Sequence, residues 1–212
     1  MIIMATRIAQ PPTDGNRTGS PSSPPSPPSH PLSSSFTFSY LDKHSITTQA
    51  SYSDSIKPLG HFHTLTHFWP LYSHLARPST LPTSLTLHLF RSHIDPIWEH
   101  TANARGGKCM LRIKKHATDR VWEQMTLALI GDAFGLGEEV CGLVLTMKAG
   151  EDMVSVWNRS AEDRDAVGRI KAVMMNVLGV DRSDAFDYRP HDVSIKSLHA
   201  AAFTGNSSTA SR

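Results

Sequence analysis

The chain has 212 residues, a formal net charge of +2 and two cysteines, and 39% of it is hydrophobic. The nearly neutral charge argues against a bulk electrostatic nucleic-acid binder, so any contact with RNA needs a small, specific site. Cys109 and Cys141 are too few and too far apart for a disulfide scaffold or a zinc site. No apolar run approaches the ~18 residues of a membrane span. We therefore expect a cytoplasmic monomer that uses no membrane, metal or cofactor.

The N-terminal segment, residues 1–35, differs in composition from the rest of the chain. Eight of the 14 prolines precede position 32, and residues 20–35 contain eight serines. Such a segment buries too little apolar surface to offset its ordering entropy, so we expect a disordered tail. Residues 36–197 then form one ordinary domain. Residues 198–212 are small and polar, and we expect a frayed C-terminal tail.

The domain opens with a predicted strand, because Phe36, Phe38 and Tyr40 alternate with polar residues. Residues 42–55 are polar and indicate a loop. A helix over 64–76 follows, with one apolar stripe made of Leu65, Phe68, Tyr72 and Leu75. Pro70 lies inside this pattern and predicts a late start or a kink. Trp69 lies at the edge of the stripe, so it belongs either to the core or to an exposed patch.

The middle of the chain alternates between strand and helix patterns. Residues 85–89 and 108–115 have the two-residue period of strands, and in the second strand Lys108 and Arg112 share a face. Residues 119–134 predict a helix whose stripe is Val121, Met125, Ala128 and Leu129. Three apolar residues lie off that stripe: Leu127, Ile130 and Phe134. They are either covered by neighbours or form an exposed apolar patch.

Residues 140–148 and 153–157 predict a hairpin joined by the four residues 149–152. This turn would place Lys148 opposite Met153, on one face with Ser155 and Trp157. A third helix follows a weak capping box at Ser160 and Asp163 and ends at Gly179. Strands and helices are mixed without a regular β–α–β order, which predicts an α+β fold with an antiparallel sheet.

Enzyme motifs are absent from the sequence. We find no Gly-rich phosphate loop and no nucleophile elbow, so we expect no catalytic residue. His61, His63 and His67 have spacings that could hold a metal ion, but solvated histidines at a helix entry are the commoner interpretation. Cys141 lies in an apolar strand and is interpreted as a core residue.

Trp98 and Glu99 suggest recognition of a guanine base. They follow Pro96 in a polar segment, where a buried strand is not expected. A tryptophan ring can stack on the base while a carboxylate accepts two hydrogen bonds from its Watson–Crick edge. Methylation at the seventh nitrogen adds a cation–π attraction. Lys108, Arg112 and Lys148 could hold phosphates, although a solvated sheet face is the simpler explanation of these cations.

Several motifs, in this order and spacing, resemble the eukaryotic translation initiation factor 4E family, which binds the 7-methylguanosine cap of messenger RNA. They are the segments 68–72 (FWPLY), 94–99 (IDPIWE), 105–108 (RGGK), 129–132 (LIGD) and 140–142 (VCG). The resemblance covers residues 36–196. Segments 151–158 and 191–196, together with Tyr52, are similar to the class-II branch, the 4E-homologous protein.

The resemblance implies a curved antiparallel sheet with three long helices on its convex face and a cap-binding slot on the concave side. It implies that Tyr52 and Trp98 sandwich the methylated guanine, that Glu99 accepts from its edge, and that Trp157 contacts the methyl group. Lys108, Arg112 and Lys148 would lie near the phosphates. A partner helix carrying tyrosine, any four residues, leucine and an apolar residue would bind on the dorsal helices, at Leu65, Trp69 and Leu127.

Four positions depart from the main branch of the family. Lys148 replaces an arginine, Met153 replaces a lysine, and Cys109 and Ser39 replace tryptophans. These changes predict a weaker affinity for the cap. The implied function is cap binding in translation initiation or its regulation, with a dorsal partner of the 4G-like or 4E-binding class. The alternative is an interaction scaffold with degenerate cap binding that sequesters such partners. A cap-processing hydrolase is disfavoured, because no acidic cluster for metals is present.

Overall fold

A computed structural model describes residues 29–46 and 52–192 of the chain. These residues form a seven-stranded antiparallel sheet in the order β2-β1-β3-β5-β6-β4-β7, so the α+β prediction is confirmed. The strands are β1 (Pro31–Asp42), β2 (Ile56–Thr64), β3 (Leu85–Arg91), β4 (Gly107–Lys114), β5 (Val140–Thr146), β6 (Glu151–Asn158) and β7 (Phe186–Pro190).

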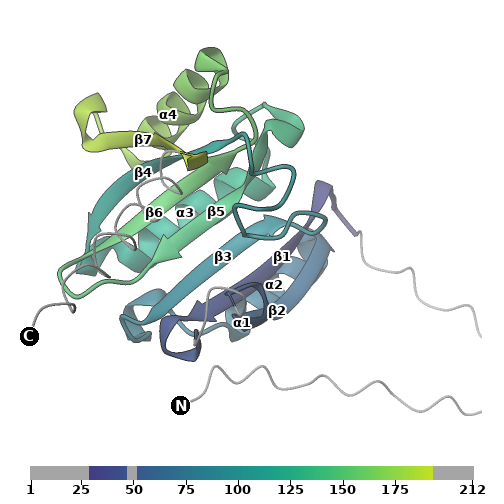
Figure 1. Cartoon of the computed structure of the whole chain (residues 1–212). Coiled ribbons are helices and arrows are strands. Elements are labelled where there is room, and N and C mark those ends of the chain that lie inside the picture. The colour runs from purple at the N-terminus through teal and green to yellow at the C-terminus, as the bar shows by residue number, and fades with distance from the viewer. Residues whose placement is uncertain (1–28, 47–51, 193–212) are drawn as a thin grey trace, which may run out of the picture.

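The three longest helices of the described residues are α2 (Leu65–His74), α3 (Thr118–Ile130) and α4 (Arg164–Leu178), and a short helix α1 (Tyr52–Ser55) precedes β2. In Figure 1 helices α2 and α3 lie behind the curved sheet, whose other face is turned to the viewer. Short 3-10 turns join the elements: η1 (Lys43–Ser45), η3 (Pro78–Thr80), η4 (Lys115–Ala117), η5 (Gly137–Glu139) and η6 (Ser183–Ala185). No helix of the described residues is long and apolar enough to cross a membrane.

The main core lies between the sheet and the helices. Phe38 of β1 contacts the rings of Phe62, Phe68, Tyr72 and Trp122, with centroids 5.6–6.5 Å apart. Trp122 is buried, as expected of a core tryptophan, and the α3 stripe predicted from the sequence is buried with it. Aromatic rings packed at these distances add to the burial of apolar area, so they fix helices α2 and α3 against the sheet.

Helix α2 begins at Leu65, at the start of the predicted range, so the late start that Pro70 suggested is wrong. The Thr64 hydroxyl accepts a hydrogen bond from the backbone N–H of His67 (3.2 Å) and caps the helix. Pro70 lies inside the helix, and its carbonyl accepts from the His74 ring at 2.6 Å and from the Ser73 hydroxyl at 3.1 Å. The cap and these side-chain bonds supply local support that the sequence pattern did not reveal.

The other helix ends differ from prediction by a few residues. Helix α3 ends at Ile130 rather than at Phe134, because Gly131 closes it with a bond from its N–H to the Leu127 carbonyl. Phe134 is nevertheless buried, from the turn beyond the helix. Helix α4 is capped by Asp163 instead of Ser160, whose N–H and hydroxyl bond to Glu139. Gly179 ends α4 as predicted, in the left-handed conformation (φ 63°).

Two strands were missed and one begins early. Strand β1 starts at Pro31, five residues before the predicted start of the domain. Strands β2 and β7 were not predicted, and both form edges of the sheet. The predicted disordered tail covered residues 1–35, and it is wrong for residues 31–35, which lie in β1. Residues 1–28 of that tail and residues 193–212, which hold the end of the predicted domain and the C-terminal tail, lie outside the described residues.

Candidate functional site

A row of side chains crosses the sheet on the face opposite the helices. In the strand register Trp157 pairs with Gly142 on one side and Lys108 on the other, and Lys108 pairs with Arg189. Cys109 and Leu111 alternate with Lys108 along β4 and belong to the core under the helices. Lys108 and its register partners Trp157 and Arg189 therefore lie on the concave face. We call Trp157, Lys108 and Arg189 the concave row.

The predicted pairing of Lys148 with Met153 is wrong. The register places Thr146 opposite Met153, because β5 ends at Thr146 and Lys148 lies in the turn. Met147 is buried in the core, and the backbone N–H of Lys148 donates to Asp152 at 2.9 Å, which holds Lys148 in the turn. Met153, Ser155 and Trp157 share one face, as two-residue alternation along β6 requires.

Trp157 is buried within a second apolar cluster, on the concave face. This concave cluster consists of Phe90, Ile94, Ala102, Cys141, Val144 and Trp157, with Trp98 packed against it. The Trp157 ring meets Phe90 edge-on at 5.5 Å and His191 at 4.2 Å. Gly142 is needed here, because a Cβ at that position would lie 2.5 Å from the Phe90 ring. Cys141 is thus a core residue, and burial raises the pKa of its thiol to about 12.

Three buried polar atoms at this point have no hydrogen-bond partner among the described residues. They are Nε1 of Trp157 and both ring nitrogens of His191. Burial, and then the charge of Lys108, lower the pKa of His191 to about 4. His191 is therefore neutral at physiological pH, and its ring supports Trp157 as an uncharged surface.

The segment that carries Trp98 is held by one buried amide. Asn103 donates through Nδ2 to the carbonyl of Asp95 at 2.8 Å and to that of Ile97 at 2.7 Å. These two bonds fold the connection between β3 and β4 back on itself. Trp98 is half-buried against the concave cluster, while Glu99 next to it is exposed. A half-exposed ring beside an exposed carboxylate is the arrangement that base stacking with edge recognition requires.

Tyr52 reaches the same place from a distant part of the sequence. Burial, and then the negative charge of Glu99, raise the pKa of the Tyr52 hydroxyl above its ordinary value. An electrostatic effect of this kind needs the two side chains to be near each other. The fold therefore places Tyr52 within electrostatic reach of Glu99, the chain neighbour of Trp98, and Trp98 packs against the cluster that contains Trp157.

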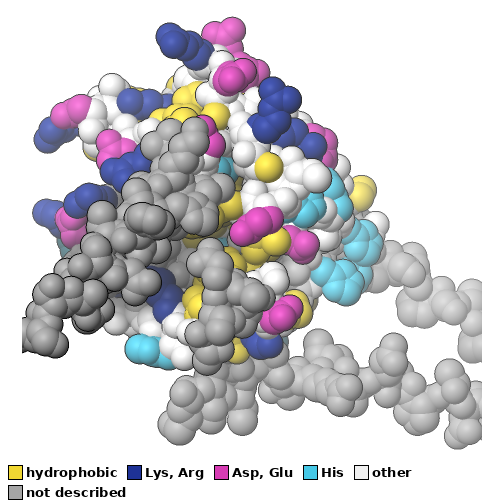
Figure 2. Space-filling view, in the orientation of Figure 1, with side chains coloured by type: hydrophobic (Ala, Val, Ile, Leu, Met, Phe, Trp, Pro, Cys, Tyr) yellow, Lys and Arg dark blue, Asp and Glu magenta, His cyan; other side chains and the backbone are white. Residues whose placement is uncertain are grey.

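The cations of this face influence one another. Burial lowers the pKa of Lys108, and the charges of Arg189 and Lys148 lower it further. Burial and Lys148 likewise lower the pKa of Lys43. Sequence reasoning missed Lys43 and Arg189, although the alternation of residues 186–189 could have revealed β7. Arg112 lies apart, two rows along the sheet, opposite Met153. Figure 2 shows basic and acidic side chains interspersed on this side of the molecule, which fits a small local site.

Asp152 fixes the turn that carries Lys148. Its carboxylate is 1% exposed and accepts from Lys115 Nζ at 2.6 Å, Thr118 Oγ1 at 2.7 Å and the Lys148 N–H at 2.9 Å. Burial alone would raise the pKa of Asp152, but these hydrogen bonds outweigh it and lower the pKa. The β5–β6 turn is thereby tied to the start of α3.

A second candidate surface lies on the helical side. Trp69 (49%) and Leu127 (36%) are the large hydrophobic residues exposed among the described ones, so a core role for Trp69 is excluded. Ile130 and Phe134 are buried and do not join them, and Leu65 is half-buried one turn before Trp69. We call Leu65, Trp69 and Leu127 the dorsal patch.

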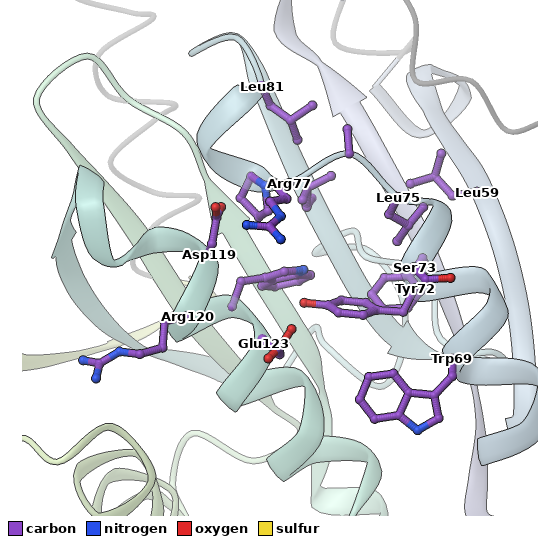
Figure 3. Close-up of a pocket in the computed structure, with 15 residues that line it drawn as sticks. Leu59, Trp69, Tyr72, Ser73, Leu75, Arg77, Leu81, Asp119, Arg120 and Glu123 are labelled. Carbon is purple, nitrogen blue, oxygen red and sulfur yellow. The ribbon is translucent and has the colours of Figure 1, made fainter.

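Trp69 of the dorsal patch lines a cavity of about 610 Å³ between α2, η3 and α3. Figure 3 shows the Trp69 ring at one end of this cavity and the Tyr72 hydroxyl pointing toward Glu123 of α3. Burial and the Glu123 carboxylate raise the pKa of Tyr72. Leu127 lies one helical turn beyond Glu123 on the same side of α3. The cavity and the patch thus form one surface across both helices.

No group of three or more His, Cys, Asp or Glu side chains in the described ranges could hold a metal ion. His63 and His67, which had ligand-like spacing, meet ring edge to ring face with centroids 5.4 Å apart.

Comparisons with known proteins all match members of one family. The family described as eukaryotic initiation factor 4E matches residues 31–204. Eukaryotic translation initiation factor NCBP of Triticum aestivum is 40% identical over 167 residues, which cover 79% of this chain and 72% of that protein. Eukaryotic translation initiation factor 4E-4 of Caenorhabditis elegans is 35% identical over 167 residues, which cover 77% of each.

Solved structures agree with these relatives. C. elegans eIF4E-3 in complex with the 4E-binding protein Mextli and a cap analog superposes with a TM-score of 0.73 at 28% identity, covering 80% of this chain and 96% of that one. Ascaris suum eIF4E-3 with an m2,2,7G cap has a TM-score of 0.69 at 29% identity and covers 77% of this chain and 92% of that one.

Proposed function

The chain belongs to the eukaryotic initiation factor 4E family, and we propose that it binds the 7-methylguanosine cap of messenger RNA as a cytoplasmic factor without catalytic activity. The proximity of Tyr52 to Glu99, with Trp98 beside them on the concave cluster, is the observation that carries this proposal. Cap complexes of two family members with the same fold support it.

Each residue of the site has a role that its chemistry suits. The rings of Tyr52 and Trp98 stack on the two faces of the methylated base, where its positive charge adds a cation–π attraction. The Glu99 carboxylate accepts two hydrogen bonds from the guanine edge. Trp157 supports the pocket beside the methyl group. Lys108, Arg112 and Lys148 bind phosphates, the first two from β4 and the third from the turn held by Asp152.

Retention on cap-analogue resin tests this pocket. Trp98→Ala removes stacking worth ~1–3 kcal/mol, and Glu99→Gln leaves a guanine donor unpaired at a cost of ~1.5–3 kcal/mol. Both variants should lose retention and keep the fold, measured by circular dichroism. Glu162→Gln, an exposed carboxylate before α4, is the matched control and should be retained. Full retention of both site variants would disprove the assignment.

We also propose that the dorsal patch binds an amphipathic helix of a 4G-like or 4E-binding protein. Two exposed apolar side chains beside a cavity of this size suit a helix that lays its leucine and tyrosine anchors in a groove. A tryptophan at the centre of such an interface is commonly a hot spot. The eIF4E-3 complex with Mextli shows that a relative of this fold binds a 4E-binding protein.

Trp69→Ala should weaken binding of a peptide carrying tyrosine, four residues, leucine and an apolar residue by ~2 kcal/mol or more. Because Trp69 is half-exposed, the melting temperature should change little. Trp98→Ala is the reciprocal control: it should keep peptide binding and lose cap binding, whereas Trp69→Ala should do the reverse. Undiminished peptide binding by Trp69→Ala would place the groove elsewhere. Peptide binding by a wild-type protein that fails on cap resin would favour the scaffold function.

A further inference from the structure

We propose that Arg189 is a further phosphate-binding residue, which works with Lys108 to hold the polyphosphate chain of the cap. This inference rests on the proposed function and adds a cation of β7 to its phosphate-binding residues. The observation behind it is the strand register. The sequence alone did not reveal the position of Arg189, because β7 was not predicted.

The register sets Arg189 directly beside Lys108. Trp157, Lys108 and Arg189 occupy neighbouring positions on β6, β4 and β7. Adjacent strands are ~4.8 Å apart, so the backbone of Arg189 lies roughly 10 Å from that of Trp157. Tyr188 packs against the core and its hydroxyl donates to Asn158 Oδ1 at 2.9 Å. Alternation along β7 therefore turns the exposed Arg189 to the concave face.

Lys108 and Arg189 are neighbouring cations that repel each other, and a bound anion would relieve this repulsion. The charge of Arg189 lowers the pKa of Lys108, and only burial has a larger effect on that pKa. None of the ion pairs among the described residues includes Lys108, Lys148 or Arg189. Asp187 shares the face with Arg189 but lies one row away, opposite Met110. A polyanion placed over Lys108 and Arg189 would relieve their mutual repulsion and gain charge-assisted hydrogen bonds.

Arg112 and Lys148 lie toward the other end of the face, near the β5–β6 turn. Arg112 has Met153 as its register partner on β6, an apolar residue that cannot bind phosphate. The guanidinium of Arg189 presents paired donors that match phosphate oxygens, which a lysine cannot do. Arg189 is thus expected to bind phosphate oxygens beside Lys108, in addition to the cations near the β5–β6 turn.

Titration of tryptophan fluorescence with 7-methyl-GTP and with 7-methyl-GMP tests this role. Arg189→Gln should lower the affinity for 7-methyl-GTP about tenfold, the expected loss of one charge-assisted contact. Affinity for 7-methyl-GMP, which lacks the distal phosphates, should change little. The slope of log affinity against log salt should fall by about one. Arg182→Gln removes an exposed arginine paired with Asp184, and this control should behave as wild type.

The outcomes separate the two proposals. Unchanged affinity of Arg189→Gln for 7-methyl-GTP would overturn the role of Arg189, and so would equal losses for both nucleotides. A selective loss of 7-methyl-GTP binding in Arg112→Gln but not in Arg189→Gln would place the phosphates along β4 and also overturn it. Wild-type protein that binds 7-methyl-GTP no better than GTP would instead contradict the cap-binding function. Arg189→Lys should keep part of the affinity, because the charge remains.

Discussion

Buried polar side chains, more than the residues that would touch a ligand, give this site its shape. Asn103 holds the segment of Trp98 in place by donating two hydrogen bonds to backbone carbonyls. Asp152 accepts hydrogen bonds from Lys115, Thr118 and the Lys148 N–H. Asn103 satisfies two carbonyl acceptors, and Asp152 satisfies three donors. A sequence pattern does not distinguish such residues from ordinary loop asparagines and aspartates.

Asp152→Asn should therefore destabilise the protein. An amide offers one acceptor oxygen where three donors converge on a carboxylate, so about 2–3 kcal/mol of unfolding free energy should be lost. Urea denaturation measures this loss. Asp184→Asn is the matched control, because Asp184 forms an exposed ion pair with Arg182 and its loss should have a far smaller effect. Equal stability of Asp152→Asn and wild type would mean that the buried carboxylate is not what ties the turn to α3.

At the scale of elements, the strands and helices with a clear hydrophobic period were predicted from the sequence, and the two edge strands of the sheet were not. Strands β1, β3 and β4 alternate clearly and were found, as were the three long helices. Strand β2 contains Pro58 and Gly60, which weaken a strand pattern but are tolerated at an edge. Strand β7 has five residues, and only Phe186 among them is fully buried.

The hairpin shows why the candidate site was only partly predictable. The residues of the proposed guanine pocket were predicted from Trp98, Glu99 and a family resemblance. The position of Lys148 was not, because its turn is set by a tertiary contact with Asp152. A shift of two residues keeps each side chain on its face but moves it along the strand. The proposed role of Arg189 rests on the β4–β7 register, which connects positions 81 residues apart.

At the scale of the whole molecule, one sheet separates two surfaces. The concave cluster and the concave row occupy one face, and the helices that carry the dorsal patch cover the other. Between them lies a closely packed aromatic core that includes Phe38 and Trp122. The proposed cap and partner sites can therefore be occupied at the same time, since neither uses a residue of the other.

Two buried histidines that contact the concave cluster make the fold sensitive to acid. Burial lowers the pKa of His88 to about 3, and burial together with Lys108 lowers that of His191 to about 4. Both lie below the ordinary histidine value near 6.5. Between about pH 6 and 4 the unfolded chain thus binds protons that the folded chain excludes. Stability is fully present above this window and falls as the pH decreases, by about 1.4 kcal/mol per pH unit for each histidine.

His88→Gln isolates this effect. The Ser39 hydroxyl lies 3.4 Å from Nδ1 of His88, and glutamine can keep a hydrogen bond to that serine without titrating. Urea unfolding at several pH values should give a shallower slope for His88→Gln than for wild type, by about 1.4 kcal/mol per pH unit between pH 6 and 4. His61→Gln, on the exposed side of β2, controls for the loss of a histidine as such. Parallel curves for His88→Gln and wild type would show that His88 takes up its proton equally in both states, and that the acid sensitivity arises elsewhere.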